Sequence, residues 1–314
     1  MYNYSIIIPH KNIPELLERC LASIPVRDDV QIIIVDDSSE ERLVDFARFP
    51  GKDRPHTEII FHKSSLGIAG GAGHARNVGL EVARGRWLIF ADADDFFHPA
   101  IGPAMDRHAN SDADMIFFRH DSAESSTLEP VAINTRRNRI LDELDRTGDD
   151  TKARFLISVP WGRFIRRELV RAHDIRFDEV RFSAGTLFSL RAGYFAEKIV
   201  SDPEVVYCNV RREGSLIREG RRDWEAMSQR FDVDYRASLF ACSVGRGELL
   251  ETQVAERWKE LSLLHRRGAR RLLPRLRDVC SGGVVRRVRF EEAVRRALSV
   301  FIPRKRKRNI LRHL

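Results

Sequence analysis

The sequence predicts an α/β fold in which helices flank a sheet that is buried on both faces. Short runs rich in β-branched and aromatic residues occur at 5–8, 31–35, 58–61 and 87–90. These runs are apolar along their length instead of alternating, which is typical of strands in a parallel sheet. Helix-length segments lie between them, so strand and helix alternate and right-handed crossovers are expected.

The helical segments carry apolar residues three and four positions apart, which places those residues on one face of a helix. They are Leu16, Leu17, Cys20, Leu21 and Ile24 in the first segment and Ala75, Val78 and Val82 in the third. A further strand at 115–118 follows a helix around 99–109. Residues 121–150 are polar and are predicted to form a long surface loop or insert. In this interpretation one mixed sheet continues through segments 154–157, 161–165 and 205–210, with a helix near 186–196.

The length of 314 residues, 43% of them hydrophobic, is enough to bury a sizeable core. We expect a catalytic domain over residues 1–220 and a helical, basic region over 221–314. Residues 261–314 hold 17 Lys and Arg against 3 Asp and Glu, so the net charge of +8 comes from the tail. The four cysteines show no C-x-x-C spacing, which indicates neither a zinc site nor a disulfide framework.

The N-terminus lacks the basic start and apolar stretch of a secretory signal. No window approaches the roughly 20 apolar residues of a membrane-spanning helix. A cytoplasmic location is therefore expected.

Two groups of carboxylates follow buried strands. Asp36 and Asp37 come directly after the run at 31–35, and ligands of open α/β sheets bind at such carboxyl ends. The alternative is that Asp37 or Ser38 caps the following helix.

The sequence FADADD at 90–95 places three more carboxylates after another strand, and their mutual repulsion requires a counter-charge. Mg²⁺ or Mn²⁺ would supply it and would also bind a diphosphate, whereas a plain acidic turn is the alternative.

A glycine-rich run at 67–79 separates these groups and leads into a helix, whose free N–H groups suit an anion. It matches neither the P-loop, because no Lys-Ser/Thr follows the glycines, nor a dinucleotide-binding G-x-G-x-x-G after the first strand. Those two nucleotide folds are therefore disfavoured. A nucleotidyltransferase acting on sugar phosphates is disfavoured as well, because its glycine-rich loop should follow the first strand, where this chain has Pro9-His10-Lys11-Asn12.

Four segments, taken in order, resemble motifs of the family 2 glycosyltransferases. They are SIIIPHKN at 5–12, VDDSS at 35–39, ARNVG at 75–79 and FADADD at 90–95. The usual forms in that family are SIIIPxYN, VDDGS, ARNxG and FLDxDD. The resemblance covers residues 3–120 and continues more faintly through 160–163, 177–178, 187–188 and 212–215. It implies a GT-A-type, Rossmann-like mixed sheet, a nucleotide-diphosphate sugar donor and a divalent metal. It also implies direct displacement that inverts the anomeric carbon.

The resemblance also implies roles for particular residues. The base and ribose would lie against the backbone near Pro9 and the carboxylates of Asp36 and Asp37. The remaining donor-binding residues would be Arg76 and Asn77 near the phosphates and Asp92, Ala93 and Asp94 near ribose and metal, with Asp92 and Asp94 as metal ligands. The alternatives are a structural salt bridge from Arg76 to Asp92 or Asp94, and a helix-turn hydrogen bond for Asn77. Asp95 would only shape the turn.

The family pattern breaks where the catalytic base should stand. The expected position is Gly185, which cannot accept a proton from an acceptor hydroxyl. Asp178 or Glu179, a few residues upstream, would serve if either reached the site, and the alternative is that both are solvated loop acids. Two further hypotheses are a degenerate transferase that binds donor without efficient transfer, and a substitution in this particular sequence.

Two features bear on the acceptor. Trp161 would stack on an acceptor sugar or, alternatively, belong to the core. Residues 284–302 place apolar side chains mostly along one helical face and are followed by the basic run 304–308, which favours peripheral contact with an anionic membrane over a simple docking helix. Nucleic-acid binding is not expected, because no recognition module accompanies the charge.

The working hypothesis is therefore a hexosyl or N-acetylhexosaminyl transferase that uses a UDP-sugar. It would act on a glycan or lipid-linked acceptor in bacterial surface polysaccharide synthesis, at the inner face of the plasma membrane.

Overall fold

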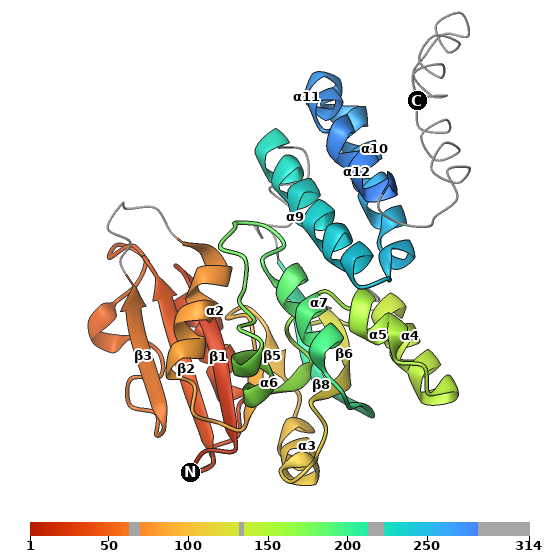
Figure 1. The fold of residues 1–314 in the computed structure, drawn as a ribbon. Helices are drawn as coiled ribbons and strands as arrows, with labels where there is room; N and C mark the ends of the chain where they lie inside the picture. Colours follow the sequence, from red (N-terminus) through yellow and green to blue (C-terminus); the bar gives the residue numbers. More distant parts are fainter. Residues whose placement is uncertain (63–69, 132–134, 213–222, 282–314) are drawn as a thin grey trace, which may run out of the picture. The chain divides into compact units, whose positions relative to one another are not determined.

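The computed structural model describes residues 1–62, 70–131, 135–212 and 223–281. The chain divides into two compact units, Met1–Arg218 and Glu219–Leu314 (Figure 1). The first contains the sheet and the second contains helices. Each unit is described by itself.

Within the described residues, the first unit is built on one eight-stranded sheet with the order β3-β2-β1-β4-β7-β6-β8-β5. The strands are β1 (Tyr4–His10), β2 (Val30–Asp37), β3 (Thr57–His62), β4 (Trp87–Phe90), β5 (Phe96–Phe97), β6 (Met115–Glu124), β7 (Arg163–Arg166) and β8 (Ile199–Arg211). β1 pairs in parallel with β2 and β4, and β2 pairs in parallel with β3. β7 is antiparallel to both β4 and β6, whereas β6 and β8 are parallel. The predicted mixed α/β sheet is confirmed.

The sheet is covered by helices on both faces, which accounts for strands that are apolar without alternation. Neighbouring residues of β1 belong to different cores: Ile6 packs with α1 (Pro14–Ala22) and α3 (Ile101–His108), whereas Ile7 packs with the helices of the other face. Those helices are α2 (Gly71–Val82), α4 (Thr135–Thr147), α5 (Thr151–Leu156), α6 (Arg167–Ala172) and α7 (Gly185–Phe195). A strand buried on both sides favours apolar side chains on both faces, which makes its apolar run nearly continuous.

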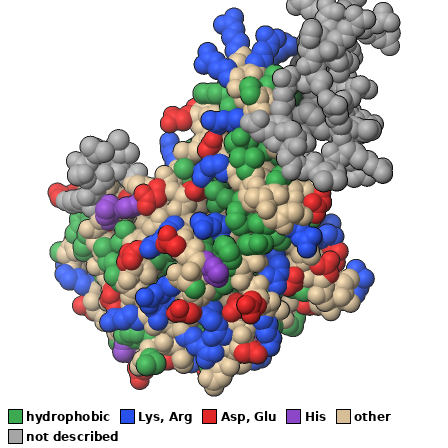
Figure 2. Space-filling model, in the orientation of Figure 1, with side chains coloured by type: hydrophobic (Ala, Val, Ile, Leu, Met, Phe, Trp, Pro, Cys, Tyr) green, Lys and Arg blue, Asp and Glu red, His purple; other side chains and the backbone are tan. Residues whose placement is uncertain are grey.

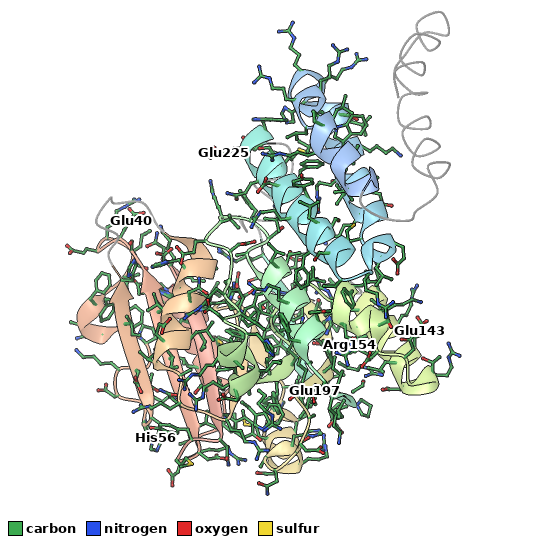
Figure 3. The ribbon with its side chains drawn as sticks, in the orientation of Figure 1. Glu40, His56, Glu143, Arg154, Glu197 and Glu225 are labelled. Atoms are coloured by element: carbon green, nitrogen blue, oxygen red, sulfur yellow. The ribbon has the colours of Figure 1, made fainter. Side chains whose placement is uncertain are left out.

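Two expectations for the middle of the chain are wrong. Residues 121–150 are not a long loop, because β6 continues to Glu124 and α4 occupies Thr135–Thr147. Leu141 on α4 is almost fully buried against the sheet, although the helix is polar on average. Residues 154–157 are not a strand: α5 ends at Leu156, and Arg154 reaches α7 by donating to the Gly193 carbonyl at 2.8 Å (Figure 3).

The second unit is helical over its described residues, in agreement with the prediction. It contains α9 (Trp224–Ser243), the short 3₁₀ helix η2 (Gly247–Leu249), α10 (Glu251–Leu264), α11 (Arg266–Arg271) and α12 (Leu273–Ser281). Phe231, Trp258 and Leu261 form part of its own buried core. The predicted amphipathic helix at 284–302 and the basic run 304–308 lie outside the described residues. No helix in the described ranges is long and apolar enough to cross a membrane.

Helix α2 approaches the sheet closely through glycine. A Cβ atom placed on Gly79 would lie 2.5 Å from Ile7 Cγ2 on β1, well inside van der Waals contact. A side chain here would push α2 off the sheet, so the glycine that ends the ARNVG segment sets the distance between helix and strand.

We therefore expect Gly79→Ala to lower the free energy of unfolding by about 1–3 kcal/mol through overpacking against Ile7. Urea denaturation measures this. Gly102→Ala on α3 is the matched control, because a Cβ there meets nothing within 4 Å and alanine favours a helix. Equal stability of the two variants would contradict close packing at Gly79.

Candidate active site

The carboxylates singled out in the sequence follow strands that end at one edge of the sheet. Because β1, β2 and β4 run parallel, with Pro9 beside Val35 and Ile7 beside Phe90, the segments that follow them leave the same edge. Asp36 and Asp37 end β2, and Asp92 lies two residues beyond β4. The acidic groups are therefore gathered where open α/β sheets bind ligands.

Asp36 is buried and ties β1 to β2. It accepts hydrogen bonds from His10 Nδ1 at 2.8 Å and from the Ser39 backbone N–H at 3.0 Å. His10 Nε2 accepts from the Ile13 N–H at 3.2 Å, so this network assigns the proton of the ring to Nδ1. Burial acts to raise the pKa of Asp36, but the hydrogen bonds from His10 and Ser39 hold it below its usual value. Asp36 is therefore an ionised carboxylate that fixes the loops after both strands.

Asp37 is buried beside Asp36 and caps α2. Its two carboxylate oxygens accept from the backbone N–H groups of Gly70 at 3.0 Å and Gly71 at 2.8 Å. The helix start that the sequence suggested for an anion thus already faces a carboxylate of the protein. The helix that follows β2 directly is the 3₁₀ helix η1 (Phe46–Arg48), and it is capped by Asp45 and not by Asp37 or Ser38. This bond fixes the position of α2 relative to β2.

Arg76 and Asn77 project from α2 in different directions. Arg76 is buried, forms an ion pair with Asp92 and lies over the Phe177 ring at 5.4 Å. Asn77 donates to the Phe177 carbonyl at 3.0 Å and accepts from the Phe177 N–H at 2.9 Å. The salt-bridge alternative for Arg76 is thus what the structure shows, and Asn77 anchors the segment at Phe177 instead of forming a helix-turn bond.

Asp94 and Asp95 face different surroundings. Asp94 accepts from Arg212 Nε at 3.1 Å, and burial together with the charge of Asp92 raises its pKa. Asp95 is fully buried and accepts from Tyr207 Oη at 2.6 Å and from the Val210 N–H at 2.7 Å. Burial, followed by the charges of Asp94 and Asp92, raises the pKa of Asp95 well above its ordinary value. Asp95 therefore anchors the acidic turn to β8.

Tyr207 connects the two ends of that turn. Its hydroxyl donates to Asp95 and accepts from the Asp92 backbone N–H at 2.9 Å, and its ring stacks on Trp161 at 5.1 Å. Asn209, two residues along β8, also donates to Asp95 at 3.1 Å. Sequence reasoning missed both residues. The available signal was their spacing, since polar groups at i and i+2 of an apolar strand share one face.

The acidic turn fits a hard divalent cation only in part. Asp92 and Asp94 offer carboxylate oxygens, the donors that Mg²⁺ and Mn²⁺ prefer, and each is paired here with one arginine. Among the described residues, three candidate ligand atoms within 4.8 Å of one another occur at His98, Asp121 and Cys208, and not at the acidic turn. A cation at Asp92 and Asp94 therefore needs further oxygens, which a diphosphate and water supply.

The segment carrying Asp178 and Glu179 lies against α2. The Asp178 N–H bonds the Ala184 carbonyl at 3.3 Å, which brings Asp178 beside the start of α7 at Gly185. Glu179 pairs with His74 at 3.1 Å and accepts from Asn77. Burial acts to raise the pKa of Glu179, but these partners hold it below its usual value. Glu179 is therefore engaged with α2, whereas Asp178 occupies the neighbourhood where a base is expected.

Gly185 itself leaves little room for a side chain. A Cβ there would lie 2.9 Å from Pro160 Cδ and 3.5 Å from the Ser158 carbonyl oxygen. A carboxylate at this position would require Pro160 to shift.

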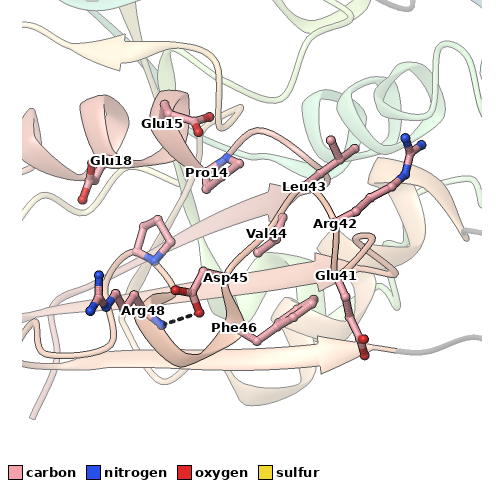
Figure 4. A pocket seen from close by; sticks show the side chains of 11 residues that line it. Pro14, Glu15, Glu18, Glu41, Arg42, Leu43, Val44, Asp45, Phe46 and Arg48 are labelled. Atoms are coloured by element: carbon pink, nitrogen blue, oxygen red, sulfur yellow. Dashed lines mark hydrogen bonds between the residues drawn. The ribbon is translucent and has the colours of Figure 1, made fainter.

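Trp161 does not present a free face, because it is 6% exposed and packs between Tyr207 and the Arg137 guanidinium, which lies 4.9 Å from the ring. The acceptor-stacking expectation is therefore wrong for this structure, and Trp161 belongs to the core. A pocket of about 630 Å³ lies elsewhere, between α1 and residues 41–50 (Figure 4). None of the donor residues expected from the sequence lines it, so it is not part of this site.

Comparison with known proteins gives the family. Residues 5–173 match the family described as "Glycosyl transferase family 2". This match covers more than half of the chain, which therefore belongs to that family and is a glycosyltransferase. The chain is 28% identical over 244 residues to the "Uncharacterized glycosyltransferase EpsJ" of Bacillus subtilis (strain 168), covering 75% of this chain and 68% of that protein.

Two solved structures show the same fold. S. aureus TarS 1–349 in complex with UDP-GlcNAc superposes with a TM-score of 0.57 at 18% identity, covering 95% of this chain and 83% of that one. The mannosyltransferase PcManGT from Pyrobaculum calidifontis in complex with GDP-Man and Mn²⁺ gives 0.52 at 14% identity, covering 96% and 88%. These similarities confirm the GT-A-type fold that the sequence predicted.

Tyr207→Phe tests the anchor of the acidic turn. The variant deprives the Asp92 N–H of its acceptor and Asp95 of a donor, so we expect the free energy of unfolding to fall by about 1–3 kcal/mol. Chemical denaturation measures the change. Tyr194→Phe on α7, where the side chain is exposed, is the control and should stay within about 0.5 kcal/mol of wild type. A neutral Tyr207→Phe would show that the turn does not depend on this hydroxyl.

Proposed function

We propose that this glycosyltransferase moves a hexose or N-acetylhexosamine from a nucleotide-diphosphate donor, preferably UDP-linked, to a glycan or lipid-linked acceptor, with inversion at the anomeric carbon. The observation that carries the proposal is the grouping of Asp36, Asp37, Asp92 and Asp94 at one sheet edge. The complex of TarS with UDP-GlcNAc supports a sugar nucleotide as donor. Surface polysaccharide synthesis is the proposed setting, and the similarity to TarS, a poly(ribitol-phosphate) beta-N-acetylglucosaminyltransferase, supports a polymeric acceptor.

The donor would lie across the edge formed by β1, β2 and β4. Backbone near Pro9 and the buried pair Asp36 and Asp37 shape the end that takes the nucleoside. Asp92, Ala93 and Asp94 would face the diphosphate and hold Mn²⁺ or Mg²⁺, which supplies positive charge for the departing diphosphate. The Mn²⁺ complex of PcManGT supports a divalent cation. Arg76 and Arg212 pair with Asp92 and Asp94 here, and their guanidinium groups would bind the phosphate oxygens of a bound donor.

Asp178 is the base that the geometry favours. In the proposed step the acceptor hydroxyl oxygen forms a bond to the anomeric carbon, while the bond from that carbon to the phosphate oxygen breaks. The electron pair of the broken bond leaves with the diphosphate, and the hydroxyl proton passes to the Asp178 carboxylate. Asp178 is better placed than Glu179 because its backbone is bonded to Ala184, next to Gly185, whereas Glu179 is held by His74 and Asn77.

A second candidate function is donor binding without efficient transfer, and the absence of a carboxylate at Gly185 favours it. In that case no nearby acid replaces the base, and turnover would not depend on Asp178.

Asp94→Asn tests the metal-dependent donor site. We expect the affinity for UDP in the presence of Mn²⁺ to fall by about tenfold or more, because an amide replaces a charged ligand. Calorimetric titration with UDP, with and without Mn²⁺, gives the answer. Asp28→Asn is the control, since this acid is fully exposed and far along the chain from the turn. Unchanged Mn²⁺-dependent affinity in Asp94→Asn would place the cation elsewhere.

Asp178→Asn separates the two functions. If Asp178 is the base, kcat should fall by about 10²–10⁴ while the affinity for donor is retained. Release of UDP from UDP-sugars with a panel of glycan and lipid-linked acceptors measures turnover, and Glu179→Gln is the matched control that should keep most activity. Gly185→Asp should not raise turnover, because its Cβ meets Pro160. A gain of activity in Gly185→Asp would instead support the degenerate transferase.

A further inference from the structure

The second unit carries a basic corner formed by the end of α10 and by α11. The basic corner consists of Leu263, Leu264, Arg266, Arg267, Arg270 and Arg271, all of them exposed. At about 100° per residue, the four arginines cover one broad side of α11. The other side is anchored, because Ala269 is buried and its carbonyl accepts from Trp258 Nε1 at 3.0 Å. The guanidinium groups therefore point outward, as the basic side chains on α11 do in Figure 3.

Leu263 and Leu264 make the basic corner amphipathic. They are 47% and 52% exposed, and they are among the most exposed large apolar side chains in the described part of the chain. Only His265 separates them in sequence from the first arginine of α11. Figure 2 shows Lys and Arg side chains gathered over α11 with hydrophobic side chains next to them. Exposed leucines beside a cluster of cations are typical of surfaces that enter the boundary between headgroups and acyl chains.

A pocket of about 520 Å³ opens at the same place. Trp224, Leu264 and Gly268 form its apolar part, and Arg266, Arg267 and Arg271 surround it. Trp224 packs directly on Gly268, where a Cβ would lie 2.4 Å from the indole ring. No Asp or Glu occurs among the described residues that line the pocket. Its chemistry suits an anionic head with an apolar body, which is the composition of a phospholipid.

We propose that the basic corner binds the surface of a bilayer that contains anionic phospholipids. Leu263 and Leu264 enter the acyl boundary, and the α11 arginines bind lipid phosphates. Nucleic acid would satisfy the charges but not the leucines, which is why the bilayer is the better fit. The proposal deepens the proposed function, on which its biological role rests, because a transferase with a lipid-linked acceptor must work at a membrane. The basic corner is distinct from the run at 304–308.

The test uses the full chain and vesicles of phosphatidylcholine with or without phosphatidylglycerol, some carrying brominated acyl chains. Trp224 is the reporter, since Trp87, Trp161 and Trp258 are buried. We expect phosphatidylglycerol-dependent binding and quenching of tryptophan fluorescence by brominated lipid. The Trp224→Phe variant should lose the quenching, because the remaining tryptophans are buried. Since Trp224 also lines the pocket, vesicle binding of this variant is measured separately by co-sedimentation.

Two variants probe the two halves of the basic corner. Replacing Arg266, Arg267, Arg270 and Arg271 by Gln should weaken binding by about tenfold or more, since each basic residue near an anionic surface contributes to attraction. Replacing Leu263 and Leu264 by Ser should reduce binding and quenching together. Leu239→Ser on α9 is the matched control, because that leucine is also exposed in the same unit. The midpoint of urea denaturation of each variant, compared with that of wild type, checks that the variant is folded.

Three results would overturn the proposal. The first is that the protein does not bind vesicles, and the second is that binding is lost only when residues 304–308 are replaced by Gln. The third is that a DNA or RNA duplex binds more tightly than vesicles and that replacing Leu263 and Leu264 by Ser does not change the affinity for the duplex. UDP titration of each variant distinguishes the two proposals: loss of vesicle binding with intact UDP affinity counts only against the basic corner, whereas absence of UDP affinity in wild type counts against the proposed function.

Discussion

The candidate active site depends on one buried carboxylate. Asp95 is fully buried, and it receives hydrogen bonds from Tyr207, Asn209 and the Val210 backbone, more than 110 positions further along the chain. An uncompensated carboxylate in this position would be costly, so the turn after β4 can be held only if β8 supplies those donors. The same Tyr207 hydroxyl accepts from the Asp92 N–H. The acidic turn is therefore positioned by the far side of the sheet and not by its own sequence.

Helix α2 organises the other half of the site. Asp37 fixes its first turn, Gly79 lets it approach β1, and its side chains Arg76 and Asn77 reach the acidic turn and the segment at Phe177. One short helix thus links the ends of β2 and β4 to the loop before α7. A change in the pairing of Arg76 with Asp92 would alter the contact between the guanidinium and the Phe177 ring on which it lies. This arrangement connects Asp92 physically to the segment that carries Asp178.

Much of this could be predicted from the sequence, because the signals were local. Continuous apolar runs indicated the parallel strands, the glycines indicated the close helix, and the ordered short motifs indicated the family. The prediction of a loop over the polar stretch 121–150 is wrong because α4 packs only a few apolar residues, Ile140, Leu141 and Leu144, into the core and is otherwise polar. The prediction of a strand at residues 154–157 is wrong because a short apolar run does not distinguish a strand from a buried helix.

The sequence by itself determined the fold class through its apolar runs and the family through its ordered motifs. It also indicated the sheet edge at which the carboxylates gather, because those residues directly follow parallel strands. Only the tertiary structure decided what each carboxylate does: Asp36 joins two strands, Asp37 caps α2 and Asp95 holds β8. It also decided that Trp161 is core and that Pro160 crowds Gly185. The physical reason is that hydrogen-bond partners in the site lie up to 118 positions apart in the chain, and no local pattern encodes which of them meet.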